Sequence, residues 1–277
     1  MSKRMAKMVE RHHWLKLVPN TLTLGNSICG FVAILFMLKV YDMPPSEALH
    51  IFAISSWIII SAMLFDVFDG FAARVFNAVS MHGLQMDSLA DMVTFGVAPA
   101  TVCAIMTHVL RADAIPSLIV YSLCAVYLGC AALRLATYNV RAMTGEKGGD
   151  SRFFSGLPTP GAAAGVCSVA MLLNYLSVKY AYSYADMNRI ALYIPVYAAV
   201  LGLLMVSNIP FPHAGKWFFT VHRSKKRMLL AAVILAVVVV FRTPGMFAVV
   251  NTYIFFGPLL TLLKKCRRKP GVKPCVS

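Results

Sequence analysis

Four aspartates lie at the ends of two consecutive apolar stretches of the chain. Asp66 and Asp69 close one stretch, and Asp87 and Asp91 open the next. They are four of only eleven acidic residues in the sequence. An ionised carboxylate at membrane depth costs roughly 3 kcal/mol or more unless it is paired or binds an ion. Four such groups close together in sequence therefore indicate a functional site that holds cations.

The spacing of the aspartates places each pair on one face of a helix. Asp66 and Asp69 are three residues apart, and Asp87 and Asp91 are four apart. Side chains at both spacings are neighbours on a helix surface. Two facing helices with two carboxylates each suit one or two hard divalent cations with oxygen ligands, Mg²⁺ or Mn²⁺. With no cysteine close by, a zinc site is not expected.

Small residues share the faces that carry the aspartates. Gly70 and Ala73 follow the first pair, and Gly83 precedes the second. Small side chains beside carboxylates leave room for a flat group to reach a bound metal. They also allow close helix packing, which is common in membranes. The neighbouring carboxylates favour the first interpretation.

The elements that must position these residues are membrane-spanning helices. Of the 277 residues, 59% are hydrophobic and only 13% are charged, and the mean hydropathy is +0.71. A soluble domain carries about 25% charged residues. A span needs about 20 apolar residues, which predicts an all-α polytopic membrane protein with about eight spans: 17–39, 48–74, 83–109, 114–139, 159–178, 189–208, 228–242 and 245–263. The seventh, with an Arg242 end and a Thr-Pro-Gly turn after it, is the weakest.

The basic residues predict the orientation of these spans. The formal net charge is +15, and 21 of the 26 Lys and Arg residues fall at the termini and in alternate loops on one side of the predicted layout. Lys and Arg are retained on the cytoplasmic side of membranes. Both termini and the site are therefore expected to face the cytoplasm, and the charge indicates anionic lipid rather than nucleic acid as a partner.

The pattern divides the chain into five parts. We expect a basic, amphipathic cytoplasmic segment at 1–16, a six-span catalytic core at 17–208 and a basic loop at 209–227. Two additional spans at 228–263 and a basic tail at 264–277 would follow. Five of the seven cysteines lie inside apolar runs, where cysteine usually packs as a small hydrophobic residue.

The aspartate motif resembles a known signature. Eight fixed positions over 26 residues match the CDP-alcohol phosphotransferase family: Asp66-x2-Asp69-Gly70-x2-Ala73-Arg74-x8-Gly83-x3-Asp87-x3-Asp91. The resemblance implies a six-helix core that holds two divalent metal ions. It implies metal ligation by all four aspartates and a further role for Asp91 as general base. It also implies nucleotide binding by Asp66, Gly70, Ala73, Arg74 and Gly83.

Three further stretches are similar to the bacterial branch of this family that uses serine as acceptor: ALRLATYN at 132–139, FSGLPTPGAAA at 154–164 and VSNIPFP at 206–212. Arg134, Asn139 and Arg141 lie at the same predicted end of the bundle as the aspartates. An arginine there could pair with the acceptor carboxylate or with a lipid phosphate. It could equally extend to the membrane interface without binding either group.

The expected reaction is transfer of a phosphatidyl group from CDP-diacylglycerol to L-serine in a bacterial inner membrane, and relatives suggest a homodimer. Related enzymes use glycerol phosphate, inositol phosphate or choline as acceptor, and the sequence leaves these open. A cation transporter is the alternative from another class. It would place carboxylates near mid-bilayer on broken helices, whereas these aspartates lie at the ends of spans.

Overall fold

The computed structural model describes residues 3–75, 80–110, 116–144, 153–180, 189–212 and 225–267. Within these ranges, side chains are described except at 3–18, 42, 73–74, 153–155, 212, 225–227 and 262–267. The elements in chain order are α1 (Lys3–Leu38), η1 (Lys39–Asp42), α2 (Pro45–Val75), α3 (Met81–Asp91), the π-helix η2 (Met92–Val97), α4 (Ala98–Leu110), α5 (Ser117–Thr144), β1 (Phe153–Ser155), α6 (Thr159–Tyr180), α8 (Tyr193–Val206), β2 (Pro210–Pro212) and α10 (Lys225–Arg267).

The prediction of an all-α polytopic membrane protein is confirmed. Seven helices in the described part of the chain are long and apolar enough to cross a membrane. The first six coincide with the first six predicted spans: Pro19–Tyr41, Pro45–Ala72, Met81–Leu110, Ser117–Thr144, Thr159–Tyr180 and Arg189–Val206. Large apolar side chains such as Phe31, Leu64 and Leu133 lie exposed on the outside of the bundle, where lipid would cover them.

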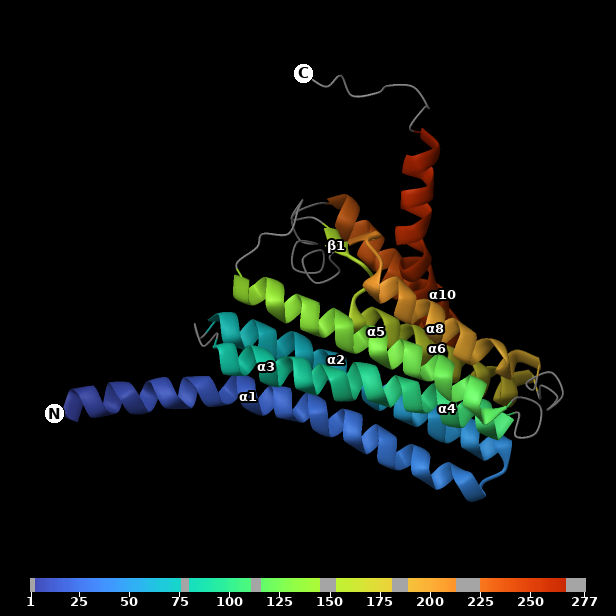
Figure 1. The fold of residues 1–277 in the computed structure, drawn as a ribbon, viewed down its shortest axis with the longest axis horizontal. Coiled ribbons are helices and arrows are strands. Elements are labelled where there is room, and N and C mark those ends of the chain that lie inside the picture. The colour runs from blue at the N-terminus through green and yellow to red at the C-terminus, as the bar shows by residue number, and fades with distance from the viewer. Residues whose placement is uncertain are drawn as a thin grey trace.

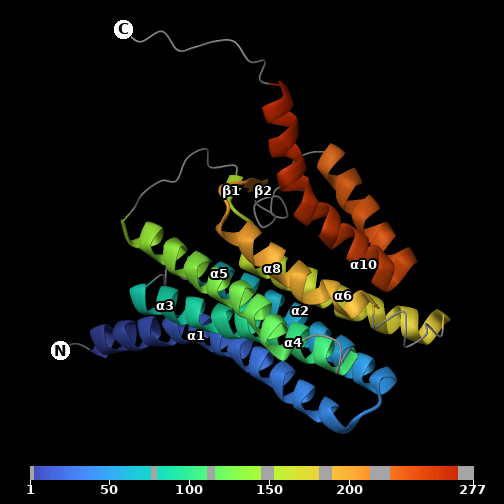
Figure 2. The same cartoon turned by 45° about the vertical axis from the view of Figure 1, so that its right-hand side comes forward.

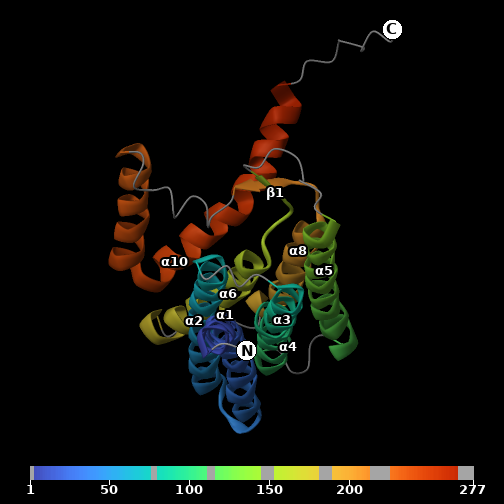
Figure 3. The same ribbon diagram turned by 90° about the vertical axis from the view of Figure 1, so that its left-hand side faces the viewer.

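The helices pack side by side into one bundle (Figure 1). Helix α1 lies along α2, and α5 lies along α8. Viewed from the N-terminal end, α3 and α4 occupy the space between α2 and α5 (Figure 3). The span formed by α3, η2 and α4 contacts α1 and α2 on one side and α5 on the other. Its residues can therefore meet side chains from all three helices.

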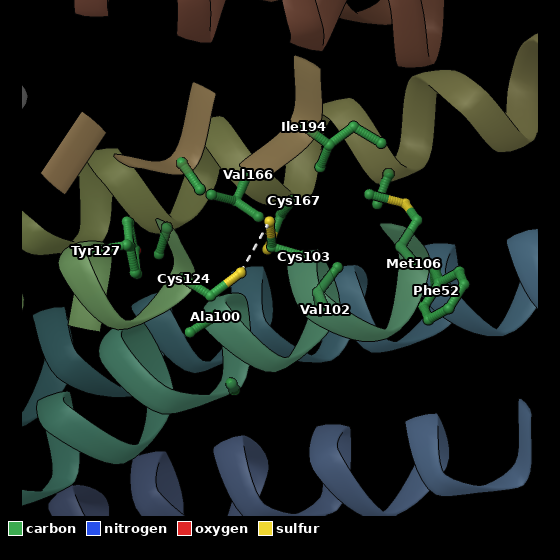
Figure 4. Packing of buried hydrophobic residues seen from close by; sticks show 14 of the residues in the cluster. Phe52, Ala100, Val102, Cys103, Met106, Cys124, Tyr127, Val166, Cys167 and Ile194 are labelled. Carbon is green, nitrogen blue, oxygen red and sulfur yellow. Dashed lines mark hydrogen bonds between the residues drawn. The ribbon is translucent and has the colours of Figure 1, made fainter. Parts of the chain in front are cut away.

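The core of the bundle is filled by apolar and aromatic side chains (Figure 4). Phe52, Met106 and Tyr127 are completely buried. Two cysteines of this core, Cys103 and Cys124, are free thiols whose sulfur atoms lie 3.5 Å apart. They pack as small apolar groups between α4 and α5.

A two-stranded antiparallel ribbon joins the ends of α6 and α8. Strands β1 and β2 pair with Phe154 opposite Phe211, so two of the motif stretches singled out in the sequence meet here. Gly156 follows β1 at φ +80°, and a side chain there would collide with the carbonyl oxygens of Met205 and Ser207. Its amide donates to the carbonyl of Ile209 at 2.9 Å. This tight contact requires glycine.

The seventh and eighth predicted spans are two helices joined at a kink, which together carry the label α10. Helix α10 runs over both, but its backbone leaves helical geometry at Arg242 (φ 49°, ψ −120°), and the two arms diverge from that point (Figure 2). A side chain at Gly245 would collide with the carbonyl oxygen of Val237, so glycine permits the tight bend. The break at Arg242 falls at the predicted end of the seventh span, directly before the predicted turn at 243–245. Residues 213–224 of the predicted basic loop and 268–277 of the predicted tail lie outside the described residues.

Candidate active site

Three carboxylates from two helices converge at one end of the bundle. Asp66 and Asp69 project from the last turns of α2, and Asp87 projects from the second turn of α3. Each offers an oxygen atom, and these oxygens lie within 4.8 Å of one another. Asp69 is buried, and Asp66 and Asp87 are half-buried. The sequence-predicted pairing of the two helix faces is therefore present in the structure.

The environment of these carboxylates fits a hard cation. All donor atoms are oxygens, which Mg²⁺ and Mn²⁺ prefer. Asp87 Oδ1 is buried and has no hydrogen-bond partner among the described residues. Likewise, no described Lys, Arg or His side chain forms an ion pair with the three aspartates. A buried carboxylate without a cationic partner is costly, and a divalent ion at the convergence point would supply the missing charge.

Helix α1 supplies hydrogen bonds that orient two of the aspartates. Thr23 donates its hydroxyl to Asp69 Oδ2 at 2.9 Å. Asn26, which is completely buried, donates its amide to Asp91 Oδ1 at 3.1 Å. Asp91 lies one turn beyond Asp87 on α3 and is buried. It is not a member of the group whose oxygens lie within 4.8 Å of one another, but it interacts electrostatically with all three of its carboxylates.

The span that carries Asp87 and Asp91 changes its winding directly after Asp91. The six residues of η2 form a π-helix, a feature that often occurs at functional sites. Two hydrogen bonds join it to helices outside the span. Thr94 donates to the backbone carbonyl of Asn26 at 2.9 Å, and Tyr127 of α5 donates to the carbonyl of Phe95 at 2.8 Å. The wider turn is thus fixed against both α1 and α5.

Besides Asp66, two of the predicted nucleotide-binding residues can be placed. Gly70 is exposed, and a Cβ atom there would have open space around it. Gly83 lies in the first turn of α3, where its amide donates to the capping side chain of Ser80 at 3.0 Å. The side chains of Ala73 and Arg74 lie outside the described residues.

The predicted acceptor-binding residues divide between two faces of α5. Asn139 accepts a hydrogen bond from Ser88 of α3 at 2.9 Å. Ser88 directly follows Asp87 in the chain, so Asn139 faces the helix that carries Asp87. Arg134 and Arg141 instead line a cavity of about 100 Å³ between α5 and the end of α8, together with Thr137, Ser207 and Asn208. Arg134 also donates to the backbone carbonyl of Met205 at 2.9 Å.

Sequence reasoning missed the contribution of α1 to the site. Asn20, Thr23 and Asn26 recur at three-residue steps inside an apolar run, which places them along one side of the helix. Polar residues with that period in a predicted span would have indicated a polar contact with the aspartates. The π-turn and the ribbon between β1 and β2 carry no comparable signal.

Comparisons with known proteins identify the family of the chain. Residues 16–202 match the family described as CDP-alcohol phosphatidyltransferase. A CDP-diacylglycerol–serine O-phosphatidyltransferase of Bacillus subtilis is 36% identical over 72% of this chain and 92% of its own length. A protein of the same description from Helicobacter pylori is 28% identical over 88% of this chain and 90% of its own. One from Methanocaldococcus jannaschii is 30% identical over 54% of this chain and 60% of its own.

The matched region contains the three-carboxylate group, Asp91 and the α1 residues that contact them, and it covers well over half of the chain. Together with the bundle of apolar helices, it identifies an enzyme of the membrane. The chain belongs to the CDP-alcohol phosphatidyltransferase family.

Proposed function

We propose that the protein transfers the phosphatidyl group of CDP-diacylglycerol to the hydroxyl of L-serine and releases CMP. The convergence of three carboxylates with Asp91 one turn further along α3 carries this proposal, because it combines a cation site with a separate basic group. The names of the relatives from Bacillus subtilis and Helicobacter pylori support serine as the acceptor.

In this proposal Asp66, Asp69 and Asp87 would hold divalent metal, with Asp91 as a further ligand. The occupied site would contain two ions. Bound metal would neutralise the charge that develops on the pyrophosphate. By holding the metal, the aspartates would fix where the pyrophosphate of the donor lies. Gly70 and Gly83, with Ala73 and Arg74 between them in sequence, leave space along the helix surface for the cytidine.

Asp91 acts as the general base. Its carboxylate accepts the proton of the serine hydroxyl while the serine oxygen forms a bond to the lipid-side phosphorus. The bond from that phosphorus to the bridging oxygen breaks, and CMP leaves with the electron pair. Phosphatidylserine remains in the bilayer, and Asp91 returns its proton to solvent before the next turnover.

An apolar groove beside the site suits an acyl chain of the donor. The groove lies between α1 and α3 and has a volume of about 340 Å³. Its walls include Leu24, Leu89 and Val93, and Thr23, which donates to Asp69, lies at its edge. A lipid with its headgroup at the aspartates could therefore place one chain here without leaving apolar surroundings.

The basic cavity at Arg134 and Arg141 is proposed to bind the carboxylate of serine. A planar guanidinium binds carboxylate through two parallel hydrogen bonds, and Thr137, Ser207 and Asn208 add polar groups to the walls. Asn139, on the α3 side of α5, would contact the acceptor nearer to the aspartates. The competing occupant of the cavity is the phosphate of the donor lipid.

The orientation and assembly of the protein belong to the same proposal. We propose that both termini and the site face the cytoplasm from a bacterial inner membrane, which the 21 basic residues on one predicted side support. We further propose that the enzyme works as a homodimer, as the family resemblance suggests.

The test is an acceptor panel. Purified protein is incubated with CDP-diacylglycerol, Mg²⁺ or Mn²⁺, and serine, glycerol phosphate, inositol phosphate or choline in separate reactions, and the lipid product is identified by mass spectrometry. We expect phosphatidylserine from serine and no product from the others. Turnover with another alcohol but not with serine would replace the acceptor and leave the reaction class in place.

A further inference from the structure

Among the described residues, Asn26 of α1 is the one side chain with a recorded hydrogen bond to Asp91. Its Nδ2 atom lies 3.1 Å from Asp91 Oδ1, and the two residues are 65 positions apart in sequence. Both side chains are buried, and Asn26 is completely so. An amide nitrogen can only donate, so this contact makes Oδ1 the acceptor and leaves the second carboxylate oxygen for another group.

Packing alone does not explain an asparagine at this position. The Oδ1 atom of Asn26 is buried without a hydrogen-bond partner among the described residues, and a buried amide oxygen in that state lowers stability. A leucine, which has the same branched shape without polar atoms, would avoid this cost in an apolar helix. The hydrogen bond to Asp91 is therefore the recorded interaction that accounts for a polar side chain at this position.

The backbone around Asn26 is fixed against the span that carries Asp91. Thr94 donates to the carbonyl of Asn26 at 2.9 Å, and a side chain at Gly30 would collide with the Thr94 backbone and hydroxyl. Helix α1 thus meets the π-helix that begins directly after Asp91 at very short range. The backbone of Asn26 is therefore held by the same span whose carboxylate its side-chain amide contacts.

We propose that Asn26 is a positioning residue for Asp91. It holds Oδ1 so that Oδ2 faces the acceptor hydroxyl during proton transfer. This inference rests on the proposed role of Asp91 as general base and adds a residue of α1 to the machinery. It does not depend on which alcohol is the acceptor, because every acceptor of this reaction must lose a hydroxyl proton.

The test is a double-mutant cycle with Asn26→Leu and Asp91→Asn, measured with the acceptor that supports turnover. Asn26→Leu should lower kcat about 10- to 100-fold, as loss of an orienting partner usually does, with little change in the KM for CDP-diacylglycerol. In the Asp91→Asn background the same substitution should change kcat by less than about twofold, because residues that act as one unit are not additive.

Asn174→Leu is the matched control. Asn174 also has a buried Oδ1 without a partner among the described residues, and it lies fifteen residues into α6. That position is roughly 22 Å from the end of α6 that adjoins β1. This control should retain the wild-type kcat. Asn26→Ala serves as a second variant if Asn26→Leu does not yield folded protein.

The outcomes separate the two proposals. Wild-type kcat in Asn26→Leu, or an equal loss of kcat in both backgrounds, would overturn the positioning role, because the effect would then not pass through Asp91. Full activity of Asp91→Asn would instead refute the general base itself and, with it, the inference that depends on it. A loss of kcat in Asn174→Leu as large as that in Asn26→Leu would show that any buried asparagine produces the effect.

Discussion

Neutralising Asp87 should stabilise the protein without metal and should reduce the stabilisation that metal provides. Asp87 Oδ1 has no hydrogen-bond partner among the described residues, so Asp87→Asn removes charge at this atom without breaking a recorded hydrogen bond. The oxygens that Asp66, Asp69 and Asp87 contribute lie within 4.8 Å of one another. Two unit charges at that separation repel by about 3.5 kcal/mol at an effective dielectric constant of 20.

Removing one of three charges removes two repelling pairs, which is about 7 kcal/mol of repulsion at that separation with all three groups ionised. Proton uptake by the cluster relieves part of that repulsion, so we expect a gain of at least about 1 kcal/mol and a Tm higher by roughly 2–4 °C. With metal present at about 100 times its Kd, the wild type gains about 2.7 kcal/mol. The variant binds metal more weakly and gains less.

The assay is thermal unfolding of purified protein in detergent, once with a chelator and once with saturating Mg²⁺ or Mn²⁺. Asp87→Asn should be the more stable protein with chelator and should gain less from metal than the wild type. The control is Glu47→Gln, which neutralises an exposed carboxylate in the first turn of the same helix that carries Asp66 and Asp69; it should respond to metal as the wild type does. A variant that is less stable with chelator, or that gains as much from metal as the wild type, would refute the account of the site.

Further predictions concern activity, acceptor binding and topology. Asp66→Asn and Asp69→Asn should each abolish turnover, because each removes a charged metal ligand; near-normal turnover at saturating metal would exclude that residue as a ligand. Arg134→Ala should raise the KM for serine at least about tenfold, the effect of losing roughly 1.4 kcal/mol of a charge-assisted contact, and should change the KM for CDP-diacylglycerol less. The reverse pattern would assign Arg134 to the lipid phosphate. A cysteine placed at Lys225 should resist a membrane-impermeant thiol reagent applied to intact cells, and one placed at Asp186 should react; labelling at Lys225 would overturn the topology.

The spans and the aspartates could be predicted because their signals are local. A run of about 20 apolar residues marks a span whatever its neighbours are. Asp66, Asp69 and Asp87 could be recognised because an ionised carboxylate in an apolar run is costly in free energy. The spacing of Asp66 and Asp69 also matches the helical period. Their convergence from α2 and α3 follows from the short connection between these helices.

The remaining parts of the site depend on contacts between distant segments. The bonds from Thr23 to Asp69 and from Asn26 to Asp91 span 46 and 65 residues, and hydropathy does not reveal which helices face each other. The π-turn at Met92–Val97 differs from a regular helix by one residue in winding, which no pattern of apolar residues specifies. The bend is an exception: its non-helical residue, Arg242, directly precedes the Thr-Pro-Gly signal that predicted it.

In the proposed reaction the oxygen of the serine hydroxyl forms the new bond to the lipid-side phosphorus. Purified protein is supplied with CDP-diacylglycerol, a divalent metal and serine labelled with ¹⁸O in its hydroxyl group, and both products are analysed by mass spectrometry. The account predicts phosphatidylserine that retains the label in the bond between serine and phosphorus, together with an equal amount of unlabelled CMP. Label in CMP, loss of label from the lipid, or the absence of phosphatidylserine would contradict it.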